Sequence, residues 1–207
     1  MYDQSNTLQQ FLAAAAARQP TPGGGSVTAL CGALASAMGE MVINYSLGKK
    51  DLAAYEAELR PALESLHRAR TMMLTLMVED QEAYAALTAA RKLPAGAHRD
   101  AAFAAALKAC IAAPQAIGAT AVAVLSICDQ VINFVNFYLL SDLAVCADLA
   151  MATTRCAIYN VRVNLADVTD AAQREQIQAT TSQLLAHAAA LIQRVAPRIW
   201  ERHGSGR

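Results

Sequence analysis

Residues 22–47 of the chain read PGGGSVTALCGALASAMGEMVINYSL, a glycine-rich loop that leads directly into an apolar helix. Glycine and proline disfavour a helix in the first few positions, whereas the alanines, leucines and methionines that follow favour one. Small residues recur throughout the helical part, so neighbouring helices can approach it closely. This stretch predicts a long, buried helix that begins at a glycine loop, and an all-α fold around it.

Further helices are predicted on both sides of this stretch. The first is expected to end at Arg18, before Gln19 and Pro20, because proline disfavours a helical conformation in the residue before it. Pro114 suits the first turn of a new helix. The remaining helices are expected at about 51–91, 99–112, 114–137, 141–165 and from 170 onward. No alternation of period two is long enough for a strand. The prediction is a single-domain bundle of about seven long helices over residues 1–207, with a disordered tail at 204–207.

The balance of charge excludes several classes of partner. Seventeen basic residues match seventeen acidic ones, so no strong field attracts nucleic acid or an anionic membrane surface. The N-terminal residues carry no basic region of a signal peptide. The five cysteines show no CxxC pair and sit in apolar helical pattern, which is typical of reduced core residues. We therefore expect a cytoplasmic protein that binds neither nucleic acid nor membrane.

Two apolar runs, 27–47 and 122–145, approach the length of a membrane-spanning helix. Glu40 and Asn44 interrupt the first run, and Asp129 and Asp142 interrupt the second. Neither run has aromatic anchors at both ends. Buried helices of a bundle explain both runs better than membrane spans.

The glycine loop is the strongest local indication of a binding site. Gly23, Gly24 and Gly25 let backbone amides approach a ligand, and the free N–H groups of a first helical turn attract anions. A substrate carboxylate or phosphate could dock there. The spacing of a P-loop is absent. The alternative is a tight turn in which Ser26 only caps the helix.

A second candidate group lies on one face of the helix predicted at 51–91. The residues Asp80, Tyr84, Leu87 and Arg91 follow one another at spacings of four, three and four, which places them on one side of a helix. An acid, a phenol and a base on one face can bind a polar substrate, and Lys92 follows immediately. The alternative is an exposed face with a weak ion pair.

The third group consists of polar residues near helix ends. Ser141 and Asp142 begin one predicted helix, and Asn160 and Asn164 lie one turn apart near its end. Asn136 precedes the group. A helix cap explains an acid at a helix start, but buried amides require hydrogen-bond partners.

Lys49 follows a glycine at the end of the first apolar helix, where it either caps the helix or serves in a site. The four histidines show no metal-ligand spacing, and no Ser/His/Asp or Cys/His pairing can be argued. We expect no metal and no covalent nucleophile.

Taken in order, these segments resemble the cyclodeaminase/cyclohydrolase family. The resemblance covers nearly the whole chain, and it rests on PTPGGGS at 20–26, GKK at 48–50, DQEAYAALTAARKLP at 80–94, Asn136 with SDLAV at 141–145, and NVRVNL at 160–165. The chain departs from the family pattern at Asp51, Ala95, Val135 and Tyr138. These departures concern the identity of the substrate more than the fold.

The resemblance implies an all-α dimer with a folate site at helix ends near the subunit interface. It implies hydrolysis of 5,10-methenyltetrahydrofolate to 10-formyltetrahydrofolate, with the folate as substrate and no cofactor. The alternatives are a cyclodeaminase, which releases ammonia from 5-formiminotetrahydrofolate, and a non-catalytic folate-binding or pterin-binding helical protein. The absence of a fused formiminotransferase domain favours the cyclohydrolase, and helices that are apolar nearly all round favour a homodimer.

Water attack on an electrophilic amidinium carbon requires a base, an orienting shell and a proton donor. We expect Lys49, held near Asp80 or Asp142, to activate water or relay protons. Tyr84 and Asn164 would orient the pterin and the water, and the glycine loop, Ser26 and Lys92 would hold the polar or glutamate end of the substrate. The predicted binding residues are Gly23, Gly24, Gly25, Ser26, Tyr84, Lys92, Asn136, Ser141, Asn160 and Asn164.

Overall fold

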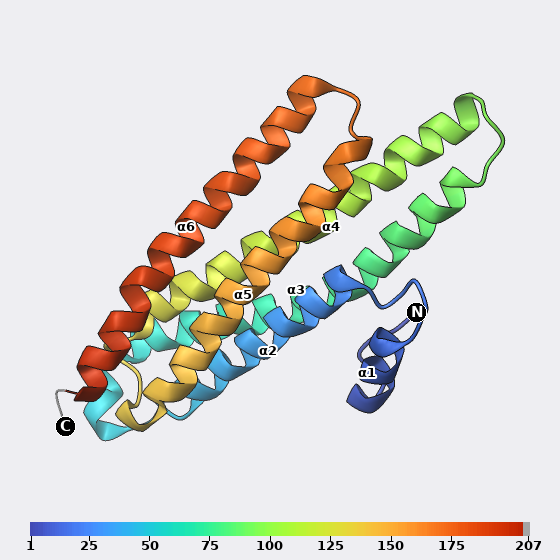
Figure 1. Cartoon of the computed structure of the whole chain (residues 1–207). Helices are drawn as coiled ribbons and strands as arrows, with labels where there is room; N and C mark the ends of the chain where they lie inside the picture. The colour runs from blue at the N-terminus through green and yellow to red at the C-terminus, as the bar shows by residue number, and fades with distance from the viewer. Residues whose placement is uncertain (205–207) are drawn as a thin grey trace.

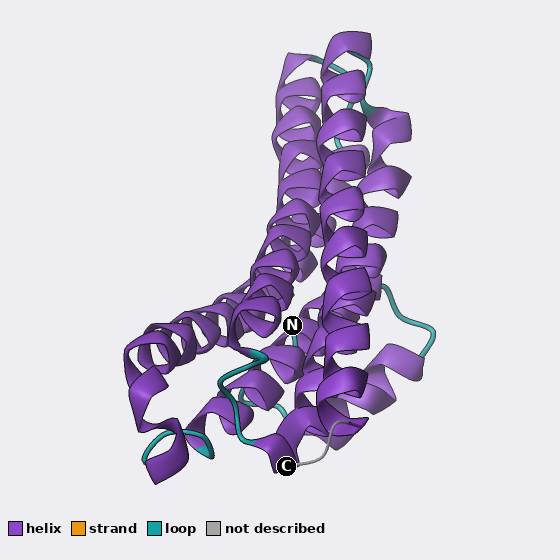
Figure 2. Cartoon of the chain, turned by 90° about the vertical axis from the view of Figure 1, so that its left-hand side faces the viewer, coloured by secondary structure: helices purple, strands orange, loops and turns teal. Residues whose placement is uncertain are grey.

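Six α-helices form the protein over residues 1–204, the part of the chain that the computed structural model describes (Figure 1). They are α1 (Leu8–Ala16), α2 (Gly24–Asn44), α3 (Glu56–Arg91), α4 (Ala97–Val131), α5 (Leu140–Asn164) and α6 (Ala171–Gly204). Short 3-10 segments occupy Lys50–Tyr55, Phe137–Leu139 and Leu165–Asp167. Residues 1–204 contain no strand, so the all-α prediction is confirmed (Figure 2). Gly204 ends α6 instead of starting a tail, and residues 205–207 of the predicted tail lie outside the described part.

The long helices pack side by side along the length of the molecule (Figure 1). Helix α2 lies against α3 and α5, α4 lies against α3 and α5, and α6 packs on α4 and α5, while α1 stands to one side. Small residues of α2 make close packing possible. A Cβ at Gly32 would lie 2.5 Å from Met73 Cε, and one at Gly39 would lie 3.0 Å from Leu66 Cδ1. The predicted close approach of helices to α2 is confirmed.

A single helix, α4, replaces the two helices predicted at 99–112 and 114–137. Pro114 lies inside α4, where it has no N–H to donate to the carbonyl oxygen of Cys110. The side-chain amide of Asn164 in α5 donates to that oxygen at 3.0 Å. Because another helix supplies the missing hydrogen bond, the proline does not end α4, and the described helices number six instead of seven.

The cysteines are free thiols, but they are not all in the core. Cys110, Cys128 and Cys146 are buried as predicted, whereas Cys31 is half-buried and Cys156 is exposed on α5. The side-chain sulfurs of Cys128 and Cys146 lie 3.4 Å apart between α4 and α5. This contact and burial raise the pKa of the Cys128 thiol, so that thiol is poorly nucleophilic.

Three helical segments of the described chain are long and apolar enough to cross a membrane by length and composition alone: 24–44, 97–131 and 137–167. In each of them the most apolar window is partly buried inside the bundle, by 56%, 61% and 44%. Much of the apolar character of these helices is therefore used in packing against the other helices.

Candidate functional site

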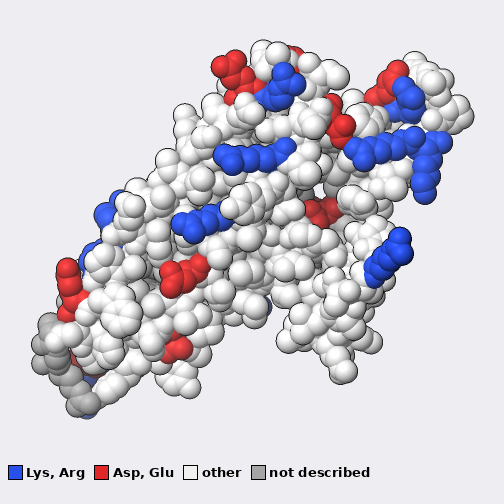
Figure 3. All heavy atoms as spheres, in the orientation of Figure 1, with Lys and Arg blue, Asp and Glu red and all other residues white. Residues whose placement is uncertain are grey.

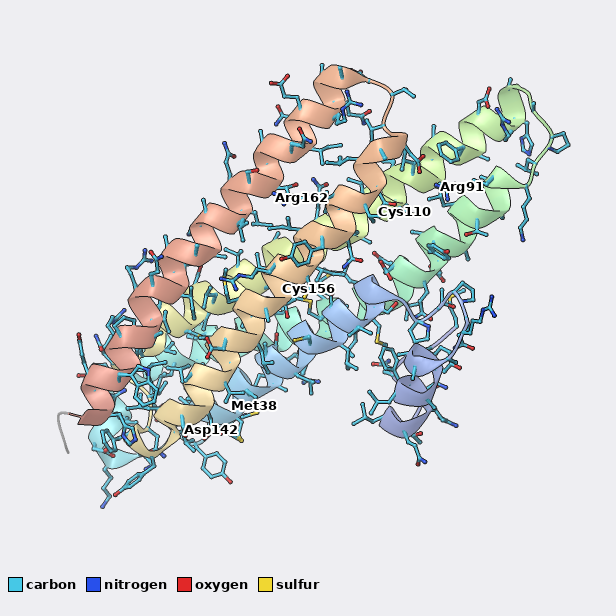
Figure 4. All side chains as sticks on the ribbon, in the orientation of Figure 1. Met38, Arg91, Cys110, Asp142, Cys156 and Arg162 are labelled. Atoms are coloured by element: carbon cyan, nitrogen blue, oxygen red, sulfur yellow. The ribbon has the colours of Figure 1, made fainter. Side chains whose placement is uncertain are left out.

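A cavity of about 330 Å³ lies where the start of α2 meets α3 and the end of α5. Figure 4 labels two of its residues, Arg91 of α3 and Cys110 of α4, beside each other at this part of the bundle. The lining residues are Pro20, Thr21, Gly23, Gly24, Gly25, Asp80, Tyr84, Leu87, Arg91, Cys110, Asn160, Val163, Asn164 and Asp167. The fold thus brings together the glycine loop, the polar stripe of α3 and the two asparagines of α5.

The carboxylate of Asp80 lies at the N-terminus of α2. Ser26, which is fully buried in the first turn of α2, donates its hydroxyl to Asp80 Oδ2 at 3.0 Å, and its backbone N–H also donates to this carboxylate. A Cβ at Gly25 would lie 1.9 Å from Asp80 Oδ1, so only glycine leaves room for the carboxylate there. The anion that this helix N-terminus attracts is therefore Asp80 itself. The expectation that Ser26 and this turn hold an anionic group of the substrate stays a prediction.

Burial raises the pKa of Asp80, and the hydrogen bonds from Ser26 offset part of that increase. A carboxylate with a raised pKa is a stronger base than an exposed one. Its negative charge, held inside a cavity, also favours a cationic group of a ligand. The site can thus bind a cation and accept a proton at the same position.

Two backbone N–H groups and the side chain of Asn160 complete this end of the cavity. Helix α2 has no side-chain N-cap, and the backbone N–H groups of Gly24 and Gly25 have no acceptor among the described residues. A Cβ at Gly24 would lie 3.1 Å from the side-chain oxygen of Asn160. The nitrogen of Asn160 donates to the carbonyl of Cys156 at 2.9 Å and lies 3.4 Å from Thr28 Oγ1. Its oxygen is thereby directed to the cavity wall beside the free amides.

The other end of the cavity is formed by an ion pair. Arg91 Nη2 lies 2.5 Å from Asp167 Oδ2, and the Arg91 guanidinium lies 5.8 Å from the centroid of the Phe103 ring. Tyr84, which is 45% exposed, lies between this pair and Asp80 on α3. Asp167 and Cys110 line the cavity but were not among the predicted site residues. Asp167 could have been found, because Asn160, Asn164 and Asp167 repeat the spacing of one helical face.

The remaining predicted residues lie elsewhere. Lys49 is at the far end of α2, where Nζ lies 5.9 Å from the centroid of the Tyr138 ring. Helix α2 has 21 residues, so roughly 30 Å separates Lys49 from Asp80 at 1.5 Å per residue. The expected proximity of these two residues is not found within one chain. Lys92 follows the end of α3 as an exposed residue and does not line the cavity.

Asn136, Ser141 and Asp142 lie at the same end as Lys49, and Figure 4 labels Asp142 there. The backbone N–H of Asn136 donates to Ser46 Oγ at 2.8 Å, and its side-chain oxygen accepts from the N–H of Tyr138 at 3.2 Å. Asn136 therefore fixes the turn before α5. Ser141 does not cap α5 as predicted, because Leu139 occupies that position and no side chain bonds to it. Ser141 and Asp142 belong to the first turn of the helix.

Across residues 1–204 no group of three or more His, Cys, Asp or Glu side chains is placed to hold a metal ion. The groups that the cavity offers are one half-buried carboxylate, two amide side chains, backbone N–H groups, a phenol and an ion pair. This set suits proton transfer to or from a polar ligand that carries a positive charge near Asp80.

The chain has relatives over nearly its whole length. A model of the formiminotransferase-cyclodeaminase family matches residues 7–183. The methenyltetrahydrofolate cyclohydrolase of Methylorubrum extorquens is 33% identical over 92% of the chain and 94% of its own length. The formimidoyltransferase-cyclodeaminase of Rattus norvegicus is 30% identical over 88% of the chain, which spans only 35% of that protein.

A solved structure agrees with these relatives. The formiminotetrahydrofolate cyclodeaminase of Thermotoga maritima superposes with a TM-score of 0.89 and 28% identity, over 95% of this chain and 96% of that one. The predicted resemblance to this family is thereby confirmed. By sequence and by fold, the chain belongs to the formiminotransferase-cyclodeaminase family.

Proposed function

We propose that this protein is a methenyltetrahydrofolate cyclohydrolase, which hydrolyses 5,10-methenyltetrahydrofolate to 10-formyltetrahydrofolate. The observation that carries the proposal is the half-buried carboxylate of Asp80 at the N-terminus of α2, in a cavity beside two free backbone amides. The relative in Methylorubrum extorquens, which the chain matches over nearly its full length, bears the name of this activity. The substrate is a cation whose charge is spread over N5, N10 and the bridging carbon, and it suits a buried carboxylate.

In the proposed reaction Asp80 accepts a proton from water while the water oxygen forms a bond to the bridging carbon. The product of this step is a neutral carbinolamine. Protonated Asp80 then donates its proton to N5 as the bond between carbon and N5 breaks, and the hydroxyl loses its proton to solvent as the formyl C=O forms on N10. One proton is released in total. The raised pKa of Asp80 suits both directions of transfer.

The neighbouring groups have supporting roles in this scheme. The N–H groups of Gly24 and Gly25 and the side-chain oxygen of Asn160 orient the attacking water. Tyr84 lies one turn along α3 from Asp80, where its ring can pack on the flat part of the substrate. Each of these steps uses side chains, backbone and water alone, so the folate is a substrate and no cofactor is required.

A cyclodeaminase is the second candidate, and the likeness to the Thermotoga maritima enzyme over almost the whole of both chains favours it. It closes the same ring with loss of ammonia.

The test of the two functions supplies 5,10-methenyltetrahydrofolate and 5-formiminotetrahydrofolate in separate assays. Methenyl absorbance is followed in both assays, and ammonia release is measured in the second. Accelerated loss of absorbance with the first substrate, absent in Asp80→Asn, supports the cyclohydrolase. Ammonia release alone supports the cyclodeaminase, and binding without turnover of either supports a folate-binding protein.

The proposal includes a homodimer formed through one face of α2 and α5. Val27 and Leu34 of α2 and Val145, Tyr159 and Val163 of α5 are all between 45% and 72% exposed. No charged residue lies between Val27 and Leu34 of α2, whereas the exposed side of α5 also carries Asp148, Arg155 and Arg162. Figure 3 accordingly shows both white areas and charged side chains on this view. An exposed apolar surface of this kind is typical of an interface. Val163 also lines the cavity, so the cavity opens at the edge of the proposed interface.

A two-fold dimer through this face would place the far end of α2 from one copy beside the cavity of the other. That arrangement accounts for the separation of Lys49 and Asp142 from Asp80 within one chain.

Sedimentation velocity of the wild type and of Leu34→Glu tests the dimer. If Lys49 acts across the interface, mixed and reassembled Lys49→Ala and Asp80→Asn chains regain activity at about a quarter of the sites. A monomeric wild type would overturn this part of the proposal. The five free cysteines favour a cytoplasmic location.

A further inference from the structure

The cavity runs along α3 from the carboxylate of Asp80 to the ion pair of Arg91 with Asp167. Asp80, Tyr84, Leu87 and Arg91 line it at spacings of four, three and four residues. Eleven residues at 1.5 Å each place Asp80 and Arg91 roughly 16 Å apart along the helix axis. Arg91 is the sole cation among the lining residues. A ligand that spans the cavity therefore meets a carboxylate at one end and a phenol and a leucine in the middle. At the other end it meets a guanidinium that is already paired with the carboxylate of Asp167.

A tetrahydrofolate carries the complementary groups in the same order. Its one-carbon bridge is cationic in the methenyl form, a flat aminobenzoyl ring follows, and a glutamate with two carboxylates ends the molecule. We infer that Arg91 binds the glutamate carboxylates of the substrate and selects folates that carry this tail. This inference rests on the proposed function, because it assumes that a folate occupies the cavity with its bridge at Asp80.

The surroundings hold the Arg91 side chain in position before any ligand binds. Asp167 accepts from Nη2 at 2.5 Å, and the ring of Phe103 lies 5.8 Å from the guanidinium carbon. A guanidinium has five N–H donors, and this ion pair occupies one of them. The remaining donors can form a bidentate pair with a carboxylate. Because the side chain is already ordered, less conformational entropy is lost on binding.

The geometry also sets the direction of the substrate. The side chain of Arg91 is 54% exposed, so further glutamates attached to the tail can extend into solvent. The glycine loop lies at the opposite end, where the carboxylate of Asp80 would repel a glutamate. The glutamate tail is therefore held at the end of α3. Of the predicted roles of the glycine loop, Ser26 and Lys92, which were to hold the polar or the glutamate end of the substrate, the glutamate role is assigned to Arg91 instead.

The test compares substrates with and without glutamate. Turnover of 5,10-methenyltetrahydrofolate and 5,10-methenyltetrahydropteroate is measured for the wild type, Arg91→Gln, Arg91→Lys and Arg99→Gln. Arg99 is a matched control, because it lies at the start of α4, pairs with Asp100 and does not line the cavity. We expect Arg91→Gln to raise KM for the folate about 10- to 100-fold with little change in kcat, and to leave KM for the pteroate unchanged. Arg91→Lys should restore part of the affinity.

Calorimetric binding of 5-formyltetrahydrofolate and 5-formyltetrahydropteroate separates this inference from the proposed reaction. Suppose that the wild type turns over neither substrate but binds the folate more tightly than the pteroate, and that Arg91→Gln loses this difference. The inference is then supported, while the proposed reaction fails. Equal KM values for the two substrates in the active wild type overturn the inference and leave the reaction in place. An equal loss of affinity for both ligands in Arg91→Gln also overturns it, as does the same effect in Arg99→Gln. If neither ligand binds, both proposals fail.

Discussion

The hydroxyl of Ser26 donates to the carboxylate of Asp80 at 3.0 Å, which joins the first turn of α2 to the middle of α3 across 54 residues of sequence. The contact places an acidic side chain at a helix N-terminus inside a cavity, where burial raises its pKa. A buried carboxylate costs stability unless it is fully compensated. A carboxylate held in this way is suited to the role of a catalytic acid or base.

Replacing Asp80 by asparagine should abolish most of the activity. The amide keeps the size of the side chain and can still accept from Ser26, but it cannot accept a proton from water. We expect kcat to fall about 10²- to 10⁴-fold, as is typical for loss of a general base. Single-turnover measurements with 5,10-methenyltetrahydrofolate check this. Undiminished kcat in this variant would remove Asp80 from the mechanism.

The same variant should be no less stable than the wild type at neutral pH. The pKa of Asp80 is higher in the folded state than its ordinary value of 3.8, so the ionised carboxylate is favoured more in the unfolded chain. The wild type therefore gains stability as the pH falls through the folded pKa, and the full gain is present below 3.8. Urea unfolding at neutral pH and near pH 3 should show the advantage of Asp80→Asn shrinking with acidity. An advantage that grows with acidity would contradict the raised pKa.

Adding one methyl group at Gly25 should damage both the fold and the site. A Cβ there would lie 1.9 Å from Asp80 Oδ1, so the carboxylate must move out of its place. We expect Gly25→Ala to lower the free energy of unfolding by about 1–3 kcal/mol and to lose most of the activity. Gly23→Ala is the control for stability, because its nearest neighbour is the carbonyl oxygen of Pro20 at 3.7 Å. Equal denaturation midpoints for the two variants would show that the crowding at Gly25 is not significant.

The acid limb of the pH–activity profile should reflect the ionisation of the Asp80 carboxyl group. Activity requires the ionised carboxylate, so it falls as the pH decreases through a pKa above 3.8. The hydrogen bond from the Ser26 hydroxyl lowers this pKa, so Ser26→Ala should move the limb to higher pH. Ser36→Ala is a suitable control, because Ser36 is buried in the same helix but bonds to the carbonyl of Gly32. If the acid limb lies at the same pH in Ser26→Ala as in the wild type, it reflects the ionisation of another group.

The side-chain amide of Asn164 should stabilise α4 only because Pro114 interrupts that helix. Asn164→Ala removes the donor at 3.0 Å from the Cys110 carbonyl and should cost about 1–3 kcal/mol. In a Pro114→Ala background the new backbone N–H can serve the same carbonyl, so the cost should be smaller. A double-mutant cycle by urea unfolding measures the difference, expected at about 0.5–3 kcal/mol. Additive costs would show that the two residues act independently.

Local patterns predicted much of the protein before any contact between helices was known. The apolar periods and small residues of 22–47 predicted the buried helix α2, and the absence of period two predicted the lack of strands. The spacing of Asp80, Tyr84 and Arg91 predicted one shared face, and these residues do line one cavity. Such features depend on residues three or four apart on one helix, so the sequence contains them directly.

The contacts between different helices could be known only from the tertiary structure. The sequence suggested that Pro114 starts a helix, because the donor that satisfies Cys110 comes from Asn164, 54 residues away in another helix. It also suggested that Lys49 lies near Asp80 or Asp142. Helix α2 holds Lys49 and Asp80 at opposite ends, and Asp142 lies at the same end as Lys49.

The sequence by itself determined the helical class, the order of the motifs and the residues that share a helix face. Only the tertiary structure decided that the glycine loop receives Asp80, that Arg91 and Asp167 close the other end of the cavity, and that Lys49 lies far from both. The physical reason is that helix periodicity is set by local backbone hydrogen bonds, whereas the distance between two side chains on different helices depends on how the whole core packs.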